Sequence, residues 1–180
     1  NSISGPIPVS FGNLSSLTYL DFSYNQFNGT LPQNFGQLKN LVELSFQYNS
    51  ILGSIPVSFG NLSSLTYLDF SSNQFNGTLP QNFGQLKNLV RLDFWNNSIS
   101  GPLLVSLGNL STLTYLDLSF NQFNGTLPQN FGQLSELKIL YIESNMLEGV
   151  VTEVHFSNLT SLNKLYAFGN HLTLEVSNNW

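Results

Sequence analysis

The sequence predicts a solenoid, in which short similar units coil and stack on one another, and three observations predict this fold class. The segment LTYLDFSYNQFNGTLPQNFGQ at 17–37 returns almost unchanged at 65–85, and again as LTYLDLSFNQFNGTLPQNFGQ at 113–133. Within each copy, apolar residues recur at a spacing that fits neither a long strand nor a helix. Asn, Gly and Pro residues interrupt every copy at the same places.

The period of the repeat is 24 residues. Residues 14–61 and 62–109 differ at only 10 of 48 positions, and each block divides into two related units of 24. A unit opens with one short strand, in which Leu20 and Phe22 alternate inward. Turn residues punctuate the return path, in the first full unit Asn25, Gly29, Pro32 and Gly36. Because one unit cannot bury its own apolar face, neighbouring units must stack to form a core.

The unit LSSLTYLDFSYNQFNGTLPQNFGQ resembles the plant-type leucine-rich repeat, LxxLxxLxLxxNxLxGxIPxxLGx, with Phe often in place of Leu. The Asn position of this motif holds Asn1, Asn25, Asn49, Asn73, Asn97, Asn121, Asn145 and Asn170. The Gly position holds Gly29, Gly53, Gly77, Gly101, Gly125 and Gly149. The resemblance implies an α/β horseshoe-type solenoid, a right-handed superhelix with a parallel β-sheet on its concave face and a mostly irregular or 3-10 convex side. It also implies an inward Asn ladder, whose amides pair with buried backbone groups.

The resemblance covers nearly the whole chain as a single array of about seven units. The expected boundaries are 1–13 (partial), 14–37, 38–61, 62–85, 86–109, 110–133, 134–158 and 159–180 (partial). The 134–158 unit has one extra residue, which predicts a bulge on its return path. Leu103–Leu104 and Val151–Thr152 replace the apolar-Pro pair of other units, so we expect both turns to differ. Both terminal caps are expected to be missing, because the family's caps usually contain Cys pairs and this chain has no Cys.

Composition and charge exclude several classes of partner. Charged residues make up 8% of the chain and the net charge is −5, so no basic patch is available for nucleic acid or anionic lipid. The sequence contains neither an apolar run long enough to cross a membrane nor a signal peptide. His155 and His171 stand apart from any polar cluster, so we expect no catalytic site, metal or cofactor.

Sequons indicate a secretory compartment. The expected N-glycosylation sites are Asn13, Asn28, Asn61, Asn76, Asn109, Asn124 and Asn158. Asn96 also begins a sequon, but we expect it to be unoccupied because a glycan there would shield Trp95. Glycans at the other positions would leave the sheet open.

The candidate functional surface is the strand face opposite the core, where more than half of the charged residues lie. Five of the ten differences between the two 48-residue copies also fall there: Tyr24/Ser72, Glu43/Arg91, Ser45/Asp93, Gln47/Trp95 and Tyr48/Asn96. The scaffold is repeated while this face diverges. The predicted ligand-binding residues are Tyr19, Asp21, Tyr24, Glu43, Tyr48, Tyr67, Asp69, Arg91, Asp93, Trp95, Tyr115, Asp117, Phe120 and Tyr141.

Asp69, Asp93 and Asp117 should stand side by side on successive strands, and two interpretations of this acidic run are open. The first is a solvated Asp column with no function. The second is a site that accepts Lys or Arg from a bound peptide or protein, bordered by Trp95 and neighbouring aromatic residues.

The resemblance implies an extracellular module, in the apoplast or at the cell surface, that recognises a peptide or protein ligand for a plant receptor-like protein in defence or developmental signalling. The segment from Leu147 onward resembles membrane-anchored receptor-like proteins in particular, and a co-receptor would share the signal. Two alternatives remain open: a secreted protein that resembles polygalacturonase inhibitors, and a structural or ice-binding protein whose Thr, Ser and Asn columns order water.

Overall fold

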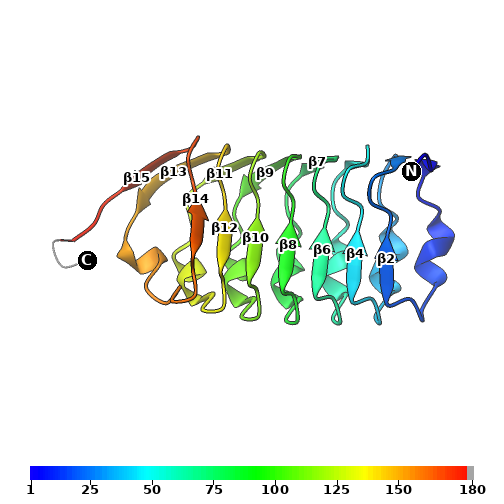
Figure 1. Cartoon of the computed structure of the whole chain (residues 1–180), viewed down its shortest axis with the longest axis horizontal. Coiled ribbons are helices and arrows are strands. Elements are labelled where there is room, and N and C mark those ends of the chain that lie inside the picture. Colours follow the sequence, from blue (N-terminus) through cyan, green and yellow to red (C-terminus); the bar gives the residue numbers. More distant parts are fainter. Residues whose placement is uncertain (178–180) are drawn as a thin grey trace.

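The computed structural model describes residues 1–177 and shows a row of similar coils stacked side by side (Figure 1). One strand of each coil contributes to a seven-stranded parallel sheet, here called the main sheet. Its strands are β2 (Tyr19–Asp21), β4 (Glu43–Ser45), β6 (Tyr67–Asp69), β8 (Arg91–Asp93), β10 (Tyr115–Asp117), β12 (Ile139–Tyr141) and β14 (Lys164–Tyr166). The last three residues of the expected unit 159–180 lie outside the described residues.

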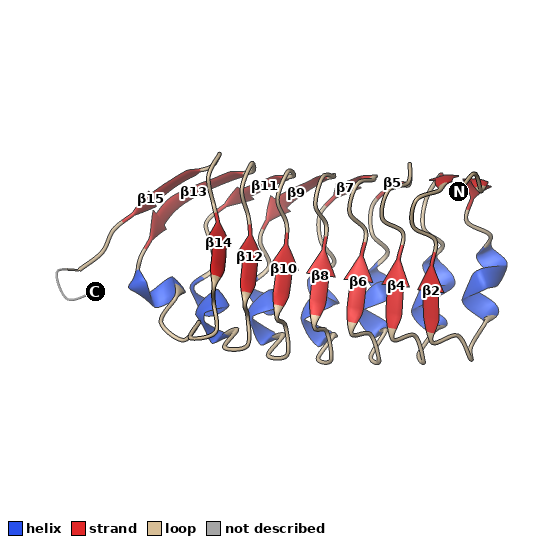
Figure 2. Cartoon of the chain, viewed as in Figure 1, coloured by secondary structure: helices blue, strands red, loops and turns tan. Residues whose placement is uncertain are grey.

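A second strand in most coils is the main departure from the sequence prediction, which gave each unit one strand. These strands form a six-stranded parallel sheet, here called the second sheet (Figure 2). It contains β5 (Leu52–Gly53), β7 (Gln74–Gly77), β9 (Ser98–Pro102), β11 (Gln122–Gly125), β13 (Met146–Val151) and β15 (His171–Leu174). A separate pair joins β1 (Ser4–Pro6) to β3 (Gln26–Asn28). Extended backbone after the Asn position pairs with the same segment of the neighbouring coil.

The return path of each coil contains a short 3-10 helix. These helices are η1 (Val9–Asn13), η2 (Gln33–Gln37), η3 (Val57–Asn61), η4 (Gln81–Gln85), η5 (Val105–Asn109), η6 (Gln129–Gln133) and η7 (Glu153–His155). The glycine inside each five-residue helix lets the next coil approach, because a Cβ on Gly36 would lie 2.3 Å from the carbonyl oxygen of Ser58. The 3-10 side and the parallel main sheet confirm the expected fold class.

Rows of apolar side chains run along the solenoid and form one core. Phe46, Phe70 and Phe94 are fully buried, and their ring centroids follow one another at 6.0 and 5.9 Å. Burying a side chain of this size contributes about 2–3 kcal/mol. Leu20 is buried and Phe22 packs against the same core from a half-buried position. The predicted inward alternation on the strand is therefore confirmed.

The Asn side chains at the repeated turn connect neighbouring coils. Asn97 donates from Nδ2 to the carbonyl oxygens of Phe70, Phe94 and Trp95 at 3.0–3.3 Å, and its Oδ1 accepts the N–H of Phe75 at 3.0 Å. The same donor and acceptor pattern recurs at Asn49, Asn73, Asn121, Asn145 and Asn170. Asn25 accepts the N–H of Ile3 in the preceding coil and donates only to carbonyl oxygens of its own coil. Each side-chain amide thus pairs with backbone N–H and C=O groups of the turns that the two sheets leave without a partner.

The two turns that lack the apolar-Pro pair behave differently from each other. The expectation of an altered turn at Leu104 is wrong: this residue has φ −73° and ψ 127°, close to the values of Pro80 before η4. An ordinary residue reaches this extended region without strain, so Pro is not required. At Thr152, φ is −126° and the helix that follows has only three residues.

The Asn ladder continues across the extra residue of unit 134–158, and only the number of residues between the bonded partners increases. Asn170 reaches the Ile142 carbonyl 28 residues earlier, whereas Asn145 reaches the Leu118 carbonyl 27 residues earlier. The strand β13 is also longer than β11, with six residues against four. The Thr152 and His155 side chains and backbones close a capping box at the start of η7.

Candidate binding face

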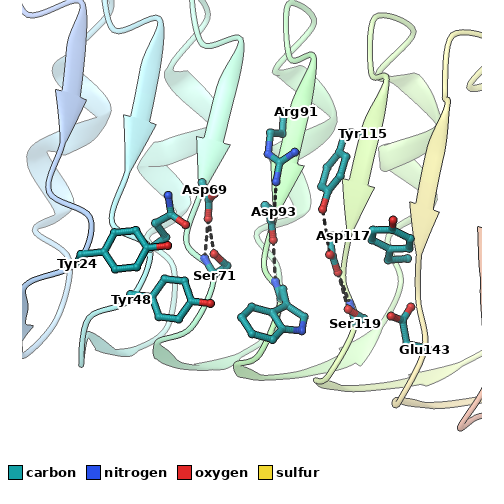
Figure 3. A pocket seen from close by; sticks show the side chains of 13 residues that line it. Tyr24, Tyr48, Asp69, Ser71, Arg91, Asp93, Tyr115, Asp117, Ser119 and Glu143 are labelled. Atoms are coloured by element: carbon teal, nitrogen blue, oxygen red, sulfur yellow. Dashed lines mark hydrogen bonds and ion pairs between the residues drawn. The ribbon is translucent and has the colours of Figure 1, made fainter. Parts of the chain in front are cut away.

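The outward face of the main sheet, here called the main-sheet face, brings most of the predicted site residues together. Parallel register places Tyr67, Arg91 and Tyr115 opposite one another on β6, β8 and β10. A hollow of about 380 Å³ lies over these strands (Figure 3). The predicted residues that line it are Tyr24, Tyr48, Asp69, Arg91, Asp93, Trp95, Tyr115, Asp117 and Tyr141.

The remaining predicted residues lie beside this hollow. Tyr19, Asp21, Glu43 and Tyr67 line a smaller hollow of about 190 Å³ toward the N-terminal end of the sheet. The Phe120 ring stands edge-on to Trp95, with 6.4 Å between the ring centroids. The predicted site is therefore split between two hollows.

Arg91 occupies the centre of the main-sheet face. Its guanidinium lies 3.6 Å from the ring centroid of Tyr115 and 5.7 Å from that of Tyr67, so two aromatic faces flank the cation. Its Nη2 pairs with Oδ2 of Asp93 at 2.6 Å. The side chain of Arg91 is 30% exposed and that of Asp93 only 6%. The pair is therefore largely desolvated on the Asp93 side.

The three central Asp residues do not form a solvated column, and that interpretation is wrong. Asp69, Asp93 and Asp117 are 2%, 4% and 5% exposed, because long side chains on the same face cover them. Oδ1 of Asp69 accepts from the Ser71 hydroxyl at 2.6 Å, and Oδ2 accepts from the Tyr67 hydroxyl at 3.1 Å.

The same arrangement recurs in the next coils. Asp117 accepts from the Ser119 hydroxyl and the Tyr115 hydroxyl, at 2.6 and 3.2 Å. Asp93 accepts the N–H of Trp95 at 3.1 Å and the Arg91 guanidinium on its other oxygen. Donors of the chain itself therefore engage these carboxylates, and residues two positions before and after each Asp supply them.

Burial and mutual repulsion alter the acidity of these groups. The pKa of Asp93 is raised to about 7, first by burial and then by the negative charges of Asp69 and Asp117. Burial also raises the pKa of Asp117, against hydrogen bonds from Ser119 that lower it. The pKa of Tyr67 rises to about 12 through burial and the charge of Asp69.

Sequence reasoning missed four residues that line the larger hollow: Gln47, Ser71, Ser119 and Glu143. They share one position, two residues after the Asp position of the strand. That spacing was the available signal, since a side chain two residues along a strand lies on the same face.

An aromatic row borders the hollow where the chain leaves the main sheet. Tyr24 and Tyr48 stack with 4.6 Å between ring centroids, and Tyr48 lies 6.1 Å from Trp95. The backbone is left-handed, with φ of 50–55°, at Tyr24, Tyr48, Ser72, Asn96, Phe120 and Ser144. This conformation is uncommon outside Gly. It turns the chain sharply after each strand and sets the aromatic side chains at the rim.

All eight sequon Asn residues are exposed. Asn13, Asn61 and Asn109 end 3-10 helices. Asn28, Asn76 and Asn124 lie on the strands that follow the ladder Asn, and Asn158 follows η7. Asn96 is beside the hollow, and its Nδ2 donates to the Ser72 hydroxyl at 3.2 Å.

His155 is buried, and its Nδ1 accepts the N–H of Thr152 at 3.0 Å. Within residues 1–177, no group of three or more His, Cys, Asp or Glu side chains is arranged to hold a metal ion. No helix in the same range has the length and hydropathy of a membrane span.

Family models match nearly all of the chain. A leucine-rich repeat region model covers residues 2–122, and a leucine-rich repeat model covers 111–172. No curated protein is similar enough in sequence to count as a relative.

Solved structures of plant receptors are similar to this chain over nearly its whole length. The plant peptide hormone receptor RGFR1 in complex with RGF2 is 35% identical with a TM-score of 0.93, covering 96% of this chain and 27% of the receptor chain. The ectodomain of the Arabidopsis thaliana receptor kinase GASSHO1/SCHENGEN3, in complex with CASPARIAN STRIP INTEGRITY FACTOR 2, is 34% identical with a TM-score of 0.94. That match covers 96% of this chain and 21% of the receptor chain. The chain thus spans about a quarter of these proteins.

A plant ice-binding protein is also similar in structure. It is 26% identical with a TM-score of 0.77, and the match covers 94% of this chain and 62% of that protein.

Proposed function

The chain belongs to the leucine-rich-repeat proteins, and from this membership we propose that its main-sheet face binds a peptide or a protein segment outside the plant cell. The chain would be the ligand-recognition part of a receptor-like protein, in defence or developmental signalling. Its role is recognition rather than catalysis, and a co-receptor would bind beside the ligand. N-linked glycans at the exposed sequons other than Asn96 would occupy the other faces.

One observation carries the proposal: five of the ten differences between the two copies fall on the main-sheet face, although this face holds only a small part of each copy. Of the first-copy residues Glu43, Ser45 and Gln47, none is kept in the second copy, which has Arg91, Asp93 and Trp95. The second-copy residues line the larger hollow. Tyr and Trp side chains around an Arg, here half-buried, are typical of the centre of a protein interface. The solved structures of the similar receptors are complexes, of the peptide hormone receptor RGFR1 with RGF2 and of GASSHO1/SCHENGEN3 with CASPARIAN STRIP INTEGRITY FACTOR 2, which supports a ligand-binding use of this chain.

The arrangement suits an extended peptide. Strand spacing of about 4.8 Å lets a ligand that crosses the sheet meet a new set of side chains in every coil. Trp95 and Tyr48 can pack against apolar side chains, because both combine a large apolar area with a polar atom. The Arg91–Asp93 pair fixes the floor of the hollow.

The experiment exchanges the face between copies. A library of random linear peptides is selected on the wild-type chain, and each selected peptide is tested on a variant with Arg91→Glu, Asp93→Ser and Trp95→Gln. We expect at least about a tenfold loss of affinity, since removing a central aromatic and Arg residue costs more than about 1.4 kcal/mol.

The matched control also moves first-copy residues into the second copy, but on the second sheet: Ser100→Leu with Pro102→Ser. We expect this variant to keep its affinity for the peptides. Equal binding of the selected peptides to the face-exchanged variant would contradict the proposal, provided that its circular dichroism spectrum matches wild type.

A second candidate function is ice binding, which the structural similarity to a plant ice-binding protein favours. The chain carries Thr30, Thr78 and Thr126 at equivalent exposed positions of alternate coils. An ice-binding face would slow ice recrystallisation in a frozen sucrose film, and Thr78→Lys would remove the effect. Unchanged crystal growth with the wild-type chain would exclude this candidate.

A further inference from the structure

The coil that contains β12 departs from its neighbours on the main-sheet face. On β10 the residue after Leu116 is Asp117, and Ser119 follows two positions later. On β12 the corresponding residues are Tyr141 and Glu143, and register pairs Asp117 with Tyr141. The carboxylate is thus displaced by two residues along the strand direction. It occupies the position at which the preceding coil has Ser119.

This displacement leaves Glu143 without the donors that the Asp residues have. Asp69 and Asp117 each accept from a Ser hydroxyl and a Tyr hydroxyl, and Asp93 accepts from Arg91. Glu143 is only 8% exposed, and its Oε2 has no hydrogen-bond partner. Across residues 1–177 it is the one buried carboxylate oxygen in this state.

An unpaired buried carboxylate is unfavourable, because desolvation is not offset by hydrogen bonds. Such a group either binds a proton or pairs with a cation. Burial, and after it the charge of Asp117, raises the pKa of Glu143 against a backbone hydrogen bond that lowers it. A cation that enters the hollow would provide the missing partner.

The surroundings favour a cation that binds aromatic rings. Four carboxylates and one guanidinium line the hollow, so its charge is negative overall. Trp95, Tyr115 and Tyr141 supply aromatic walls. Arg91 already shows that a guanidinium fits between rings here, 3.6 Å from the Tyr115 centroid. Guanidinium combines bidentate pairing to a carboxylate with stacking on rings, and it is less strongly hydrated than an ammonium.

We propose that Glu143 binds an arginine side chain of the ligand, with Tyr141 and Trp95 as neighbouring aromatic contacts. This assignment rests on the proposed function and names the ligand chemistry of the same hollow. Figure 3 shows the Glu143 carboxylate beside Ser119 at the β12 end of the hollow. The terminal torsion of Glu is soft, so a small rotation brings Oε2 toward the ligand.

The test uses small blocked amino acids as probes, because they need no knowledge of the natural ligand. N-acetyl-arginine N-methylamide is titrated into the isotope-labelled chain and followed by NMR. N-acetyl-citrulline N-methylamide, which is neutral and nearly the same shape, is titrated in parallel. We expect shifts at Glu143, Tyr141 and the Trp95 indole, and an affinity for arginine about tenfold or more above that for citrulline.

Glu143→Gln should reduce the affinity for blocked arginine about tenfold, while the control Glu148→Gln, an exposed residue of β13, should leave it unchanged. Equal affinity of wild type and Glu143→Gln for arginine would overturn the assignment. So would equal affinity of the wild-type chain for arginine and citrulline, a comparison that needs no variant to fold.

The outcomes for this assignment and for the proposed function are distinct. Selected peptides that lack arginine, and that bind Glu143→Gln as wild type, would reject the Glu143 assignment but leave the proposed function standing. If the selected peptides bind the variant exchanged at 91, 93 and 95 with wild-type affinity, the proposed function itself is rejected.

Discussion

The two copies 14–61 and 62–109 differ on the main-sheet face far more than in the coils that support it. The ladder bonds are nearly equal in the two copies: Oδ1 of Asn49 accepts a backbone N–H at 2.9 Å, and Oδ1 of Asn97 at 3.0 Å. The hollow over the first-copy strands is about 190 Å³ and the one centred on the second copy is about 380 Å³.

The charged groups of the two copies also have different surroundings. In the first copy, Glu43 hydrogen-bonds the exposed Tyr19, which raises the pKa of Tyr19, and Ser45 carries no charge. In the second copy, Arg91 and Asp93 form a pair whose carboxylate is buried. One scaffold thus supports a contact between Glu43 and the exposed Tyr19 in one copy, and a charge pair with a buried carboxylate in the other. The ladder hydrogen bonds stay the same in both copies, so substitutions on the main-sheet face leave the supporting coils intact.

The largest expected effect tests the Asn ladder, which the two copies share. Asn49→Ala and Asn97→Ala each remove one acceptor and the amide donor that reaches three carbonyl oxygens. Leaving buried backbone groups unpaired should lower the free energy of unfolding by about 3 kcal/mol. We expect the two losses, measured by urea denaturation, to agree within about 1 kcal/mol. A much larger loss for one variant would show that the two scaffolds are not equivalent.

Much of this scaffold could be predicted from the sequence, because a 24-residue period leaves few other ways to bury Leu20 and Phe22. The second sheet could not, since its strands are stabilised by pairing between coils rather than by an alternating pattern within one coil. Nor could the turn at Leu104, where buried apolar packing holds the backbone in the conformation that Pro has elsewhere.

The position of the candidate site could be predicted from the sequence, but the burial of its charged side chains could not. Alternation along the strand placed Asp93 and Trp95 on one face. It could not show that Asp93 is buried, because its cover comes from side chains two residues away and on neighbouring strands. Glu143 was left out of the predicted list although it has the same strand position as Trp95, because alternation places a side chain on a face but does not show which side chains line a hollow.

An intermediate effect is expected from the charge pair that only the second copy has. Arg91→Ala leaves the Asp93 carboxylate buried without its cation, and we expect a loss of about 2 kcal/mol. Glu43→Ala at the equivalent position should change stability by less than about 0.5 kcal/mol, since its partner Tyr19 is exposed.

A double variant sharpens this result. Adding Asp93→Ser to Arg91→Ala introduces the first-copy residue and removes the unpaired charge, so most of the lost stability should return. Urea denaturation of the four proteins of this cycle measures the coupling between the two side chains. Additive losses at Arg91 and Asp93 would contradict a paired network.

The smallest expected effect is a pH dependence that the second copy has and the first lacks. The pKa of Asp93 is about 7 in the folded chain and near 3.8 when unfolded. Between these values the folded state binds the proton more tightly, so stability should fall as pH rises from about 4 to 7 and level off above that. Between pH 6 and 7 alone we expect a decrease of about 1 kcal/mol from this residue. It is measured by urea denaturation against Asp93→Asn, which keeps an acceptor for the Trp95 N–H but does not titrate. Groups far from Asp93 contribute equally to both curves, so the difference between the curves reports Asp93 together with the two carboxylates whose charges act on it. Parallel curves would mean that Arg91 holds Asp93 ionised across this range, and that the second copy differs from the first in shape rather than in proton binding.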